Sequence, residues 1–257
     1  RVPFVIGGVF GLISIYLRRF LQETPVFKKM RESKALAKFP LEEVVKTSRF
    51  GIWISMFITW VLTGCIVVFI LLMPGFVGGV LGFSPFETTY FQMGGLVCIV
   101  SSCWLTGRLA DKHNPSTLCI LFSAGFAVSS VAFFSLLYTA APVVSEVVLA
   151  YFATCFFAGI MNFCPIFMCD VFPARIRFSG ISFAYNIAYA LSGAFTPQLS
   201  FALHAYAKTH PDTLGAMGLS AYIVFLALVS IGTALAMRRV YKNGGAAVSQ
   251  MEFRPAP

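Results

Sequence analysis

Long uncharged apolar runs, one after another, constrain this chain more than any other feature of its sequence. A helix needs about 20 residues to cross the roughly 30 Å hydrocarbon core of a bilayer. Seven stretches of about that length have central parts without Asp, Glu, Lys or Arg: Val2–Leu17, Phe50–Met73, Phe86–Thr106, Pro115–Tyr138, Val143–Met168, Ser179–Leu203 and Leu214–Met237. The pattern predicts an all-α membrane protein with seven transmembrane helices.

The first of these runs, Val2–Leu17, is the shortest. At 1.5 Å per residue it reaches only about 24 Å as a helix. We therefore expect it to be cut short at its outer end and the chain to be a fragment of a longer protein.

Positive charges are distributed unevenly among the segments between the runs. Of the 19 Lys and Arg residues, 17 lie on one side of the membrane if each run crosses it once; they fall in residues 18–49, 108–112, 175–177 and 238–254. Cytoplasmic loops are the ones enriched in Lys and Arg. We expect the N-terminus outside and the C-terminus in the cytoplasm. The same distribution argues against nucleic acid as the reason for the net charge of +9.

The composition agrees with a lipid environment. Apolar residues make up 58% of the chain and charged residues 11%, whereas a soluble domain has about 25% charged residues. The seven cysteines lie in or beside the apolar runs and form no Cys-x-x-Cys pair. They are interpreted as small packing residues rather than as disulfides or metal ligands, and neither a metal nor a cofactor is expected.

Short local patterns predict several helix boundaries. Ser84-Pro85-Phe86-Glu87 reads as a capping box, and a capping role for Glu87 is favoured over one in attracting substrate. Asn114-Pro115 begins the next run in the same way. In the long basic segment, Pro40–Lys46 reads as a short amphipathic helix lying on the membrane surface.

The segment after the first run carries the most specific pattern. Arg18 and Arg19 end the run, and positive side chains stabilise a helix at its C-terminus. Thr24 precedes Pro25, which predicts that the helix has stopped there. Together with Glu23 they resemble the end of the sixth helix in the metabolite:proton symporters of the major facilitator superfamily. That family includes α-ketoglutarate, shikimate, citrate and proline/betaine permeases.

The resemblance implies the major facilitator fold, with helices 6–12 of twelve present. Residues 1–18 would be the last helix of an otherwise missing N-terminal half, and residues 19–49 the cytoplasmic loop between the halves. Residues 50–240 would be the C-terminal six-helix half, and residues 241–257 a cytoplasmic tail.

Two loops fit the same resemblance. Phe69–Pro74, followed by Leu81–Ser84, looks like the exit of the family's seventh helix and the loop after it. Gly107, Arg108 and Asp111 match the opening of the superfamily's motif between helices 8 and 9. There the glycine lets the loop approach a neighbouring helix, and the Asp sits at the positive N-terminus of helix 5. The resemblance thus implies conformational gating; an ordinary charged turn is the alternative.

A third stretch surrounds a Phe-Pro break between the fifth and sixth runs. Asp170, Arg175 and Arg177 resemble the family's Glu-x-Phe-Pro-x-Arg-x-Arg, with Asp in place of Glu. Such an acid–arginine pair can hold two helix ends together while a transporter faces one side and release them when it rocks. Ordinary positive charge on the cytoplasmic side is the alternative explanation.

Polar side chains inside the runs are the candidates for substrate contact. Ser182, Asn186 and Tyr189 recur at helical spacing on one face, beside a row of small packing residues: Gly180, Ala184, Ala188 and Ser192. A helix with one packing face and one polar face suits the wall of a cavity. Further candidates on other runs are Asn162, Trp60, Thr63 and Thr59. For each, an interhelical hydrogen bond or a place at the membrane interface is the alternative.

These features predict secondary active transport of a small organic solute, such as a dicarboxylate, a related organic acid or a betaine- or proline-type zwitterion. Proton symport by alternating access is expected, and no Asp, Glu, Lys, Arg or His lies in the interior of the runs. The proton-coupling residues are therefore expected in the missing half. The expected partners are the solute, the proton, the lipid bilayer and that half, and the expected location is the bacterial cytoplasmic membrane.

Other classes fit less well. A sugar porter or another solute porter of the same superfamily is the nearest alternative. A seven-helix receptor shares the topology, but Leu214–Met237 has no lysine for retinal and no Asp-Arg-Tyr motif is present. An intramembrane enzyme would need paired carboxylates, metal-ligand spacing or a Gly-x-Ser-x-Gly motif, so the chain is not expected to be an enzyme.

Overall fold

The structure is a computed structural model that describes residues 1–20, 28, 31–32, 39–139, 141–210 and 215–242. All regular secondary structure in these residues is helical, as the sequence predicts. The chain divides into two units, one of residues 1–38 with 253–257 and the other of residues 39–252. Each unit is described by itself, and the described part of the second is called the bundle below.

The first unit contains an apolar helix, α1 (Val2–Arg18), that begins with proline in its first turn and has Arg18 in its last. Proline is favoured at the start of a helix and arginine at its end, so these bounds follow from the sequence. With 17 residues, α1 is shorter than the helices that meet the length criterion for a membrane span. Glu23, Thr24 and Pro25 lie outside the described residues, and the helix stop there stays a prediction.

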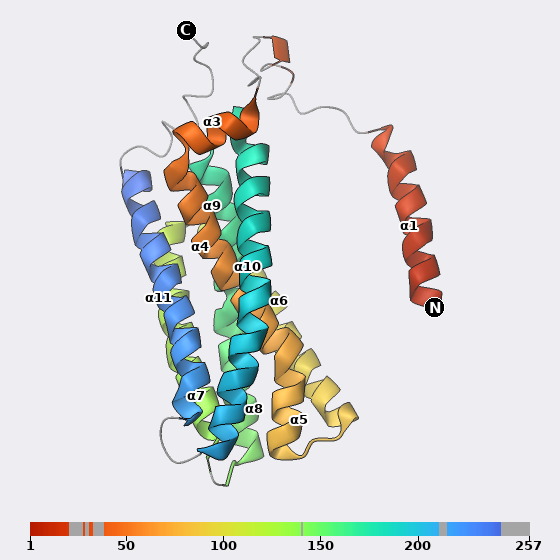
Figure 1. The fold of residues 1–257 in the computed structure, drawn as a ribbon, viewed down its shortest axis with the longest axis vertical. Helices are drawn as coiled ribbons and strands as arrows, with labels where there is room; N and C mark the ends of the chain where they lie inside the picture. The colour runs from red at the N-terminus through yellow and green to blue at the C-terminus, as the bar shows by residue number, and fades with distance from the viewer. Residues whose placement is uncertain (21–27, 29–30, 33–38, 140, 211–214, 243–257) are drawn as a thin grey trace. The chain divides into compact units, whose positions relative to one another are not determined.

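The bundle consists of long helices, two of them interrupted, and a short helix across one end (Figure 1). In chain order its elements are α3 (Pro40–Thr47), α4 (Arg49–Cys65), the π-helix η1 (Ile66–Leu72), α5 (Met73–Leu81), α6 (Pro85–Ala110), α7 (Pro115–Leu137), α8 (Val144–Phe157), the 3₁₀-helix η2 (Ala158–Asn162), α9 (Phe163–Val171), α10 (Ala174–Thr209) and α11 (Gly215–Lys242).

Among the described residues, five helical stretches are long and apolar enough to cross a membrane: Arg49–Leu81, Pro85–Ala110, Pro115–Leu137, Val144–Val171 and Met217–Lys242. They confirm five of the seven predicted spans. α10 has 36 residues but does not reach the apolar criterion, because polar side chains such as Asn186 and Gln198 interrupt its apolar character. The crossings by α1 and α10, and the orientation of the termini, stay predictions.

The predicted helix caps are present. The backbone N–H of Ser84 donates to the Glu87 carboxylate at 2.8 Å, and the Glu87 N–H donates to the Ser84 hydroxyl at 3.3 Å. Asn114 accepts from the N–H of Ser116 at 2.9 Å. Glu87 and Glu146 both lie within the first turn of their helices, so these carboxylates mark helix starts at the edges of the predicted spans.

The first interruption surrounds Pro74. The second apolar run is predicted to end there, but the helix continues through α5 to Leu81 and ends at Gly82, whose φ of 69° is left-handed. The exit from the membrane stays a prediction. Proline has no N–H for the carbonyl of Ile70. The Gln92 side chain of α6 donates to that carbonyl at 2.7 Å, and the widened η1 turn accommodates the change.

The second interruption is η2, which separates α8 from α9 just before Pro165. A tight contact fixes it: a Cβ added to Gly159 would lie 2.0 Å from the Ser102 hydroxyl of α6. Pro197, by contrast, lies inside α10, which continues through it as one helix. The two spans with real changes of helix type are therefore α4–η1–α5 and α8–η2–α9.

The packing row predicted on α10 is buried. Gly180, Ala184, Ala188 and Ser192 all face the interior, and the row continues through Thr196 and Ser200. Small residues at every fourth position let α10 approach α4 closely. Large rings fill the centre on the other side, where Tyr151 of α8 donates through its hydroxyl to the Phe69 carbonyl of η1 at 2.9 Å.

Candidate functional site: a polar helix face and a charged helix junction

A connected set of polar side chains lies where α4, α10 and α11 pack together. The indole N–H of Trp60 donates to the Tyr222 hydroxyl at 3.4 Å, and that hydroxyl shares a 2.7 Å hydrogen bond with Thr196. Ser192, one turn before Thr196, donates to the Trp60 carbonyl at 3.4 Å. Three of these side chains are buried, so the network fastens the three helices together.

Trp60 belongs to this network but is not enclosed by it. Its side chain is partly exposed, and its ring meets Phe195 edge to face with centroids 6.1 Å apart. Phe195 is itself half exposed. The predicted substrate residue Trp60 thus lies at the border between the packed interior and the open side of α10.

The polar face predicted on α10 is exposed. Asn186 donates to the Ser182 carbonyl of its own helix at 2.7 Å, and Tyr189 stacks on Tyr185 with centroids 5.4 Å apart. Asn186 and Tyr189 are exposed, and Ser182 is partly exposed. Their described hydrogen bonds stay within α10, which leaves this face accessible to a ligand or a partner helix.

Asn162 and Thr63 occupy structural positions instead. The Asn162 amide, at the end of η2, donates to the Cys103 carbonyl and the Thr106 hydroxyl of α6, each at 3.2 Å. The buried Thr63 hydroxyl donates to the Thr59 carbonyl of its own helix at 2.9 Å. The interhelical hydrogen bond that the sequence left as the alternative is therefore observed for Asn162, whereas Thr63 bonds within its own helix.

The junction between α9 and α10 carries the charges predicted for gating, but they do not pair with one another. Asp170 accepts a 2.5 Å hydrogen bond from the Tyr241 hydroxyl of α11. Arg175 forms an ion pair with Glu43, and Arg177 donates through Nε to the Phe172 carbonyl at 3.1 Å. In the described residues, the acid and the arginines hold different neighbours.

The partner of Arg175 comes from the predicted amphipathic helix. α3 packs against α10 and α4, with Val44 fully buried and Glu43 reaching the first turn of α10. On its outer side, Lys46 pairs with Glu42 at 2.5 Å. The sequence predicts a helix lying on the membrane surface. The helix is present, but its apolar side packs on protein, because Val44 is buried in the bundle and Glu43 pairs with Arg175.

The motif between α6 and α7 is divided between a helix and a short loop. Gly107 and Arg108 form the last turn of α6, and exposed Asp111 is its C-cap. The Arg108 guanidinium lies over the Trp104 ring, 4.2 Å from its centroid. Gly107 is thus helical rather than part of the loop, and it lies beside Asn162 of the bundle, whose amide nitrogen would be 3.5 Å from an added Cβ.

Sequence reasoning missed several members of these sites. Glu43 and Tyr241 reach the charged junction from distant segments, and Tyr222 with Thr196 completes the polar network. The only sequence signal was for Thr196, which continues the four-residue spacing of the α10 packing row. In the described residues, no group of three or more His, Cys, Asp or Glu could hold a metal ion.

A bundle of long apolar helices, two of them interrupted and one with a polar face, defines a multi-pass integral membrane protein. A family model described as Major Facilitator Superfamily matches residues 1–197. The chain belongs to this superfamily.

Curated relatives agree with this assignment. The chain is 28% identical over 233 residues to the "Inner membrane metabolite transport protein YhjE" of Escherichia coli, covering 85% of the chain and 50% of the relative. It is 22% identical over 200 residues to a "Putative proline/betaine transporter" of Staphylococcus haemolyticus (77% and 42% covered). It is 24% identical over 247 residues to a "Putative metabolite transport protein" of Haemophilus influenzae (90% and 52% covered).

The chain spans about half the length of the curated relatives it matches. No solved structure matches it significantly.

Proposed function

We propose that this chain is part of a secondary transporter that moves a small organic solute across the bacterial cytoplasmic membrane by alternating access. The observation that carries the proposal is the superfamily match over residues 1–197. The names of the relatives, which concern metabolite and proline/betaine transport and an inner membrane, support the solute class and the location.

In this proposal α1 and α10 also cross the membrane, which gives seven crossings. The Lys and Arg bias then puts the N-terminus outside and the C-terminus in the cytoplasm. Residues 1–18 are the last helix of an N-terminal half, and residues 50–240 are the C-terminal half. α3 packs against α4 and α10. The C-terminal half therefore also includes α3, which lies within the connecting segment 19–49.

The solute is proposed to contact the exposed face of α10 through Asn186, Tyr189 and Ser182, with Trp60 at the edge of the site. An amide and phenol hydroxyls can recognise a carboxylate or a zwitterion, and aromatic faces can hold a quaternary ammonium group. Dicarboxylates, related organic acids and betaine- or proline-type zwitterions are the proposed substrates. Asn162 and Thr63 have only an indirect role here, through the helix packing that they stabilise.

Proton coupling is proposed to depend on residues of the N-terminal half. The centres of the candidate spans in this chain contain no Asp, Glu, Lys, Arg or His, and intramembrane acids or histidines are what a proton relay requires. The two halves would then share one site, with the solute held between them and the proton carrier supplied by the other half.

The charged junction and the α6–α7 loop are proposed to act in gating. Asp170, Arg175 and Arg177 hold three different neighbours at one end of the bundle, so a change of conformation can exchange these contacts without disrupting the core. Asp111, which is exposed, is available for a helix N-terminus of the N-terminal half, with Gly107 and Arg108 positioning it.

Uptake by the full-length protein tests the proposal. Cells expressing it are supplied with radiolabelled proline, glycine betaine, α-ketoglutarate, shikimate, citrate and a hexose, with and without an uncoupler. We expect uptake of one organic acid or zwitterion that the uncoupler abolishes. Hexose uptake alone would instead support a sugar porter, and no uptake above cells lacking the protein would contradict the proposal.

The binding face is tested with one substitution and a matched control. Asn186→Ala is expected to raise the KM for the transported solute about tenfold or more, because a hydrogen bond to a charged group contributes about 1.5–3 kcal/mol. Ser129→Ala on α7, where the hydroxyl also donates to its own helix, is expected to leave the KM unchanged. An unchanged KM in Asn186→Ala would remove this residue from the site.

A further inference from the structure

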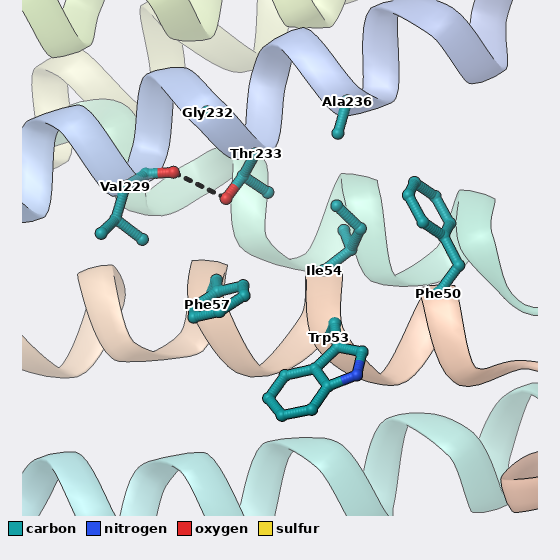
Figure 2. Close-up of a pocket in the computed structure, with 8 residues that line it drawn as sticks. All are labelled: Phe50, Trp53, Ile54, Phe57, Val229, Gly232, Thr233 and Ala236. Atoms are coloured by element: carbon teal, nitrogen blue, oxygen red, sulfur yellow. Dashed lines mark hydrogen bonds between the residues drawn. The ribbon is translucent and has the colours of Figure 1, made fainter.

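An apolar groove runs between α4 and α11, and none of the predicted substrate residues lines it. Its volume is about 380 Å³, and its walls are formed by Phe50, Trp53, Ile54, Phe57, Val229, Gly232, Thr233 and Ala236. Figure 2 shows the aromatic side chains on α4 and the small residues of α11 on opposite sides of the opening. A cavity of this volume is in the range of small-molecule sites.

The groove is open and offers almost only hydrocarbon surface. Trp53 and Phe57 are 58% and 45% exposed, and their stacked rings form one wall. The single hydroxyl in the lining, that of Thr233, already donates to the Val229 carbonyl at 2.7 Å (Figure 2). Gly232 contributes no side chain, and a Cβ added there would have nothing within 4 Å. A polar solute would gain little from such a surface.

Positive charge borders one end of the groove. Arg238, Arg239 and Lys242 line a separate cavity on α11, and of these three only Arg239 lies next to the groove lining. Arg239 follows Ala236 by three residues, so it lies on the same side of the helix, just beyond the apolar lining. In the described residues, no ion pair is formed by these three cations. Arg49 adds a further positive charge directly before Phe50.

We propose that this groove binds an anionic phospholipid, with an acyl chain against α4 and α11 and the phosphate group at Arg239 and Arg49. The charge pattern identifies the ligand: an apolar slot that ends in unpaired cations is complementary to a molecule with a long hydrocarbon chain and a negative head. Basic pockets at the cytoplasmic ends of membrane helices bind anionic head groups in this way. An inorganic phosphate would leave the apolar slot unused, and a neutral lipid would leave the cations uncompensated.

Native mass spectrometry of the full-length protein tests the proposal. The protein is freed of lipid in detergent and titrated with palmitoyl-oleoyl phosphatidylglycerol or with phosphatidylcholine that has the same chains. Two variants separate the head-group and chain contributions. Arg49→Gln/Arg239→Gln removes head-group charge, and Gly232→Leu puts a side chain into the slot at a position where an added Cβ meets nothing within 4 Å, with a better helix former.

Matched controls carry the same chemical changes elsewhere. Lys46→Gln/Lys112→Gln removes two exposed positive charges away from the groove. Gly75→Leu introduces the same side chain at an exposed helical glycine that also has nothing within 4 Å of an added Cβ. Competition with inorganic phosphate distinguishes a bound lipid from a simple anion site.

We expect the wild type to retain phosphatidylglycerol about tenfold better than phosphatidylcholine. Each cation near the head group attracts the negative charge that phosphatidylglycerol carries and phosphatidylcholine lacks. Each groove variant should reduce phosphatidylglycerol retention at least fivefold, and each control should not. Equal retention of the two lipids, displacement by phosphate, or insensitivity to Gly232→Leu would overturn the proposal. A dimer that disappears in Gly232→Leu, without lipid selectivity, would assign the groove to a second copy of the chain instead.

Discussion

The two ends of the bundle are fastened by different chemistry (Figure 1). At one end, charged groups join α3 and α11 to the α9–α10 junction through the Glu43–Arg175 ion pair and the 2.5 Å Tyr241–Asp170 hydrogen bond. At the other end, rings meet around His204 of α10.

The ring cluster involves three helices. Phe76 of α5 stacks on the His204 imidazole with centroids 4.1 Å apart. Tyr138, which follows α7, shares a 2.5 Å hydrogen bond with the same imidazole. Phe76 is 2% exposed and Tyr138 is 5% exposed, and His204 is partly exposed, so two of the three rings are packed in the interior.

The two ends therefore differ in how easily their contacts can be broken and remade. The Arg175 and Glu43 side chains are 34% and 22% exposed, and a partly solvated ion pair contributes little net stability because water competes for both charges. Buried rings lose far more when they are removed. We interpret the charged end as the place where helices separate and reclose, and the ring cluster as a fixed point.

Phe76→Ala should have the largest effect. Removing a fully packed ring costs about 3–5 kcal/mol, so the thermal unfolding midpoint in detergent should fall by several degrees or more. Phe86→Ala is the control, because the Phe86 ring is 78% exposed and its loss should change the midpoint little. Similar shifts in the two variants would remove the distinction between the ends.

Reversing the charge of Arg175 should come next in size. Arg175→Glu replaces an attraction to Glu43 with a repulsion; since each contributes up to about 1 kcal/mol in a partly solvated pair, we expect a loss of up to about 2 kcal/mol. The exchanged pair Glu43→Arg/Arg175→Glu should recover most of it, and high salt should reduce the difference between the single and double variants. The exposed pair of Glu42 and Lys46 is the control, where a charge swap should matter by less than about 0.5 kcal/mol. If the exchanged pair recovered nothing, the observed ion pair would carry no coupling.

Much of the fold could be predicted from local features of the sequence. The apolar runs gave the positions of the long helices, and the patterns at Ser84 and Asn114 gave two of their starts. The four-residue spacing of small residues gave the buried side of α10. These features are local because helix hydrogen bonds and caps join residues only a few positions apart.

The failures involve contacts between distant segments. Pro74 reads as a helix end, yet the Gln92 side chain satisfies the carbonyl that proline leaves without a donor, and the helix continues. Asp170 and Arg177 read as a pair from their spacing, yet Asp170 accepts from Tyr241 of α11, 71 residues away, and Arg177 donates to the Phe172 carbonyl. Arg175 pairs with Glu43, 132 residues away. Spacing can identify charged groups at a junction, but tertiary packing decides which of them meet.

Tyr138→Phe tests the hydrogen bond within the ring cluster. It keeps the ring but leaves the partly exposed His204 imidazole without this partner, which should cost about 1 kcal/mol. Unfolding should be easier, while the transport rate at saturating solute should stay within about twofold because the proposed fixed point does not open. A large fall in rate with unchanged stability would show that this end moves in the cycle. Tyr90→Phe, at a ring that is 72% exposed, is the control for loss of a hydroxyl.

Tyr241→Phe should have the smallest effect on stability and the opposite pattern. The Asp170 carboxylate is exposed, so water can replace the lost hydroxyl, and we expect a cost of less than about 1 kcal/mol. If the charged end must open and reclose, losing this contact should change the transport rate more than Tyr138→Phe does. Asp170→Asn should weaken the same contact, and the double variant should therefore be less than additive. Full additivity, or a rate unchanged in both single variants, would mean that the Tyr241–Asp170 contact has no part in gating.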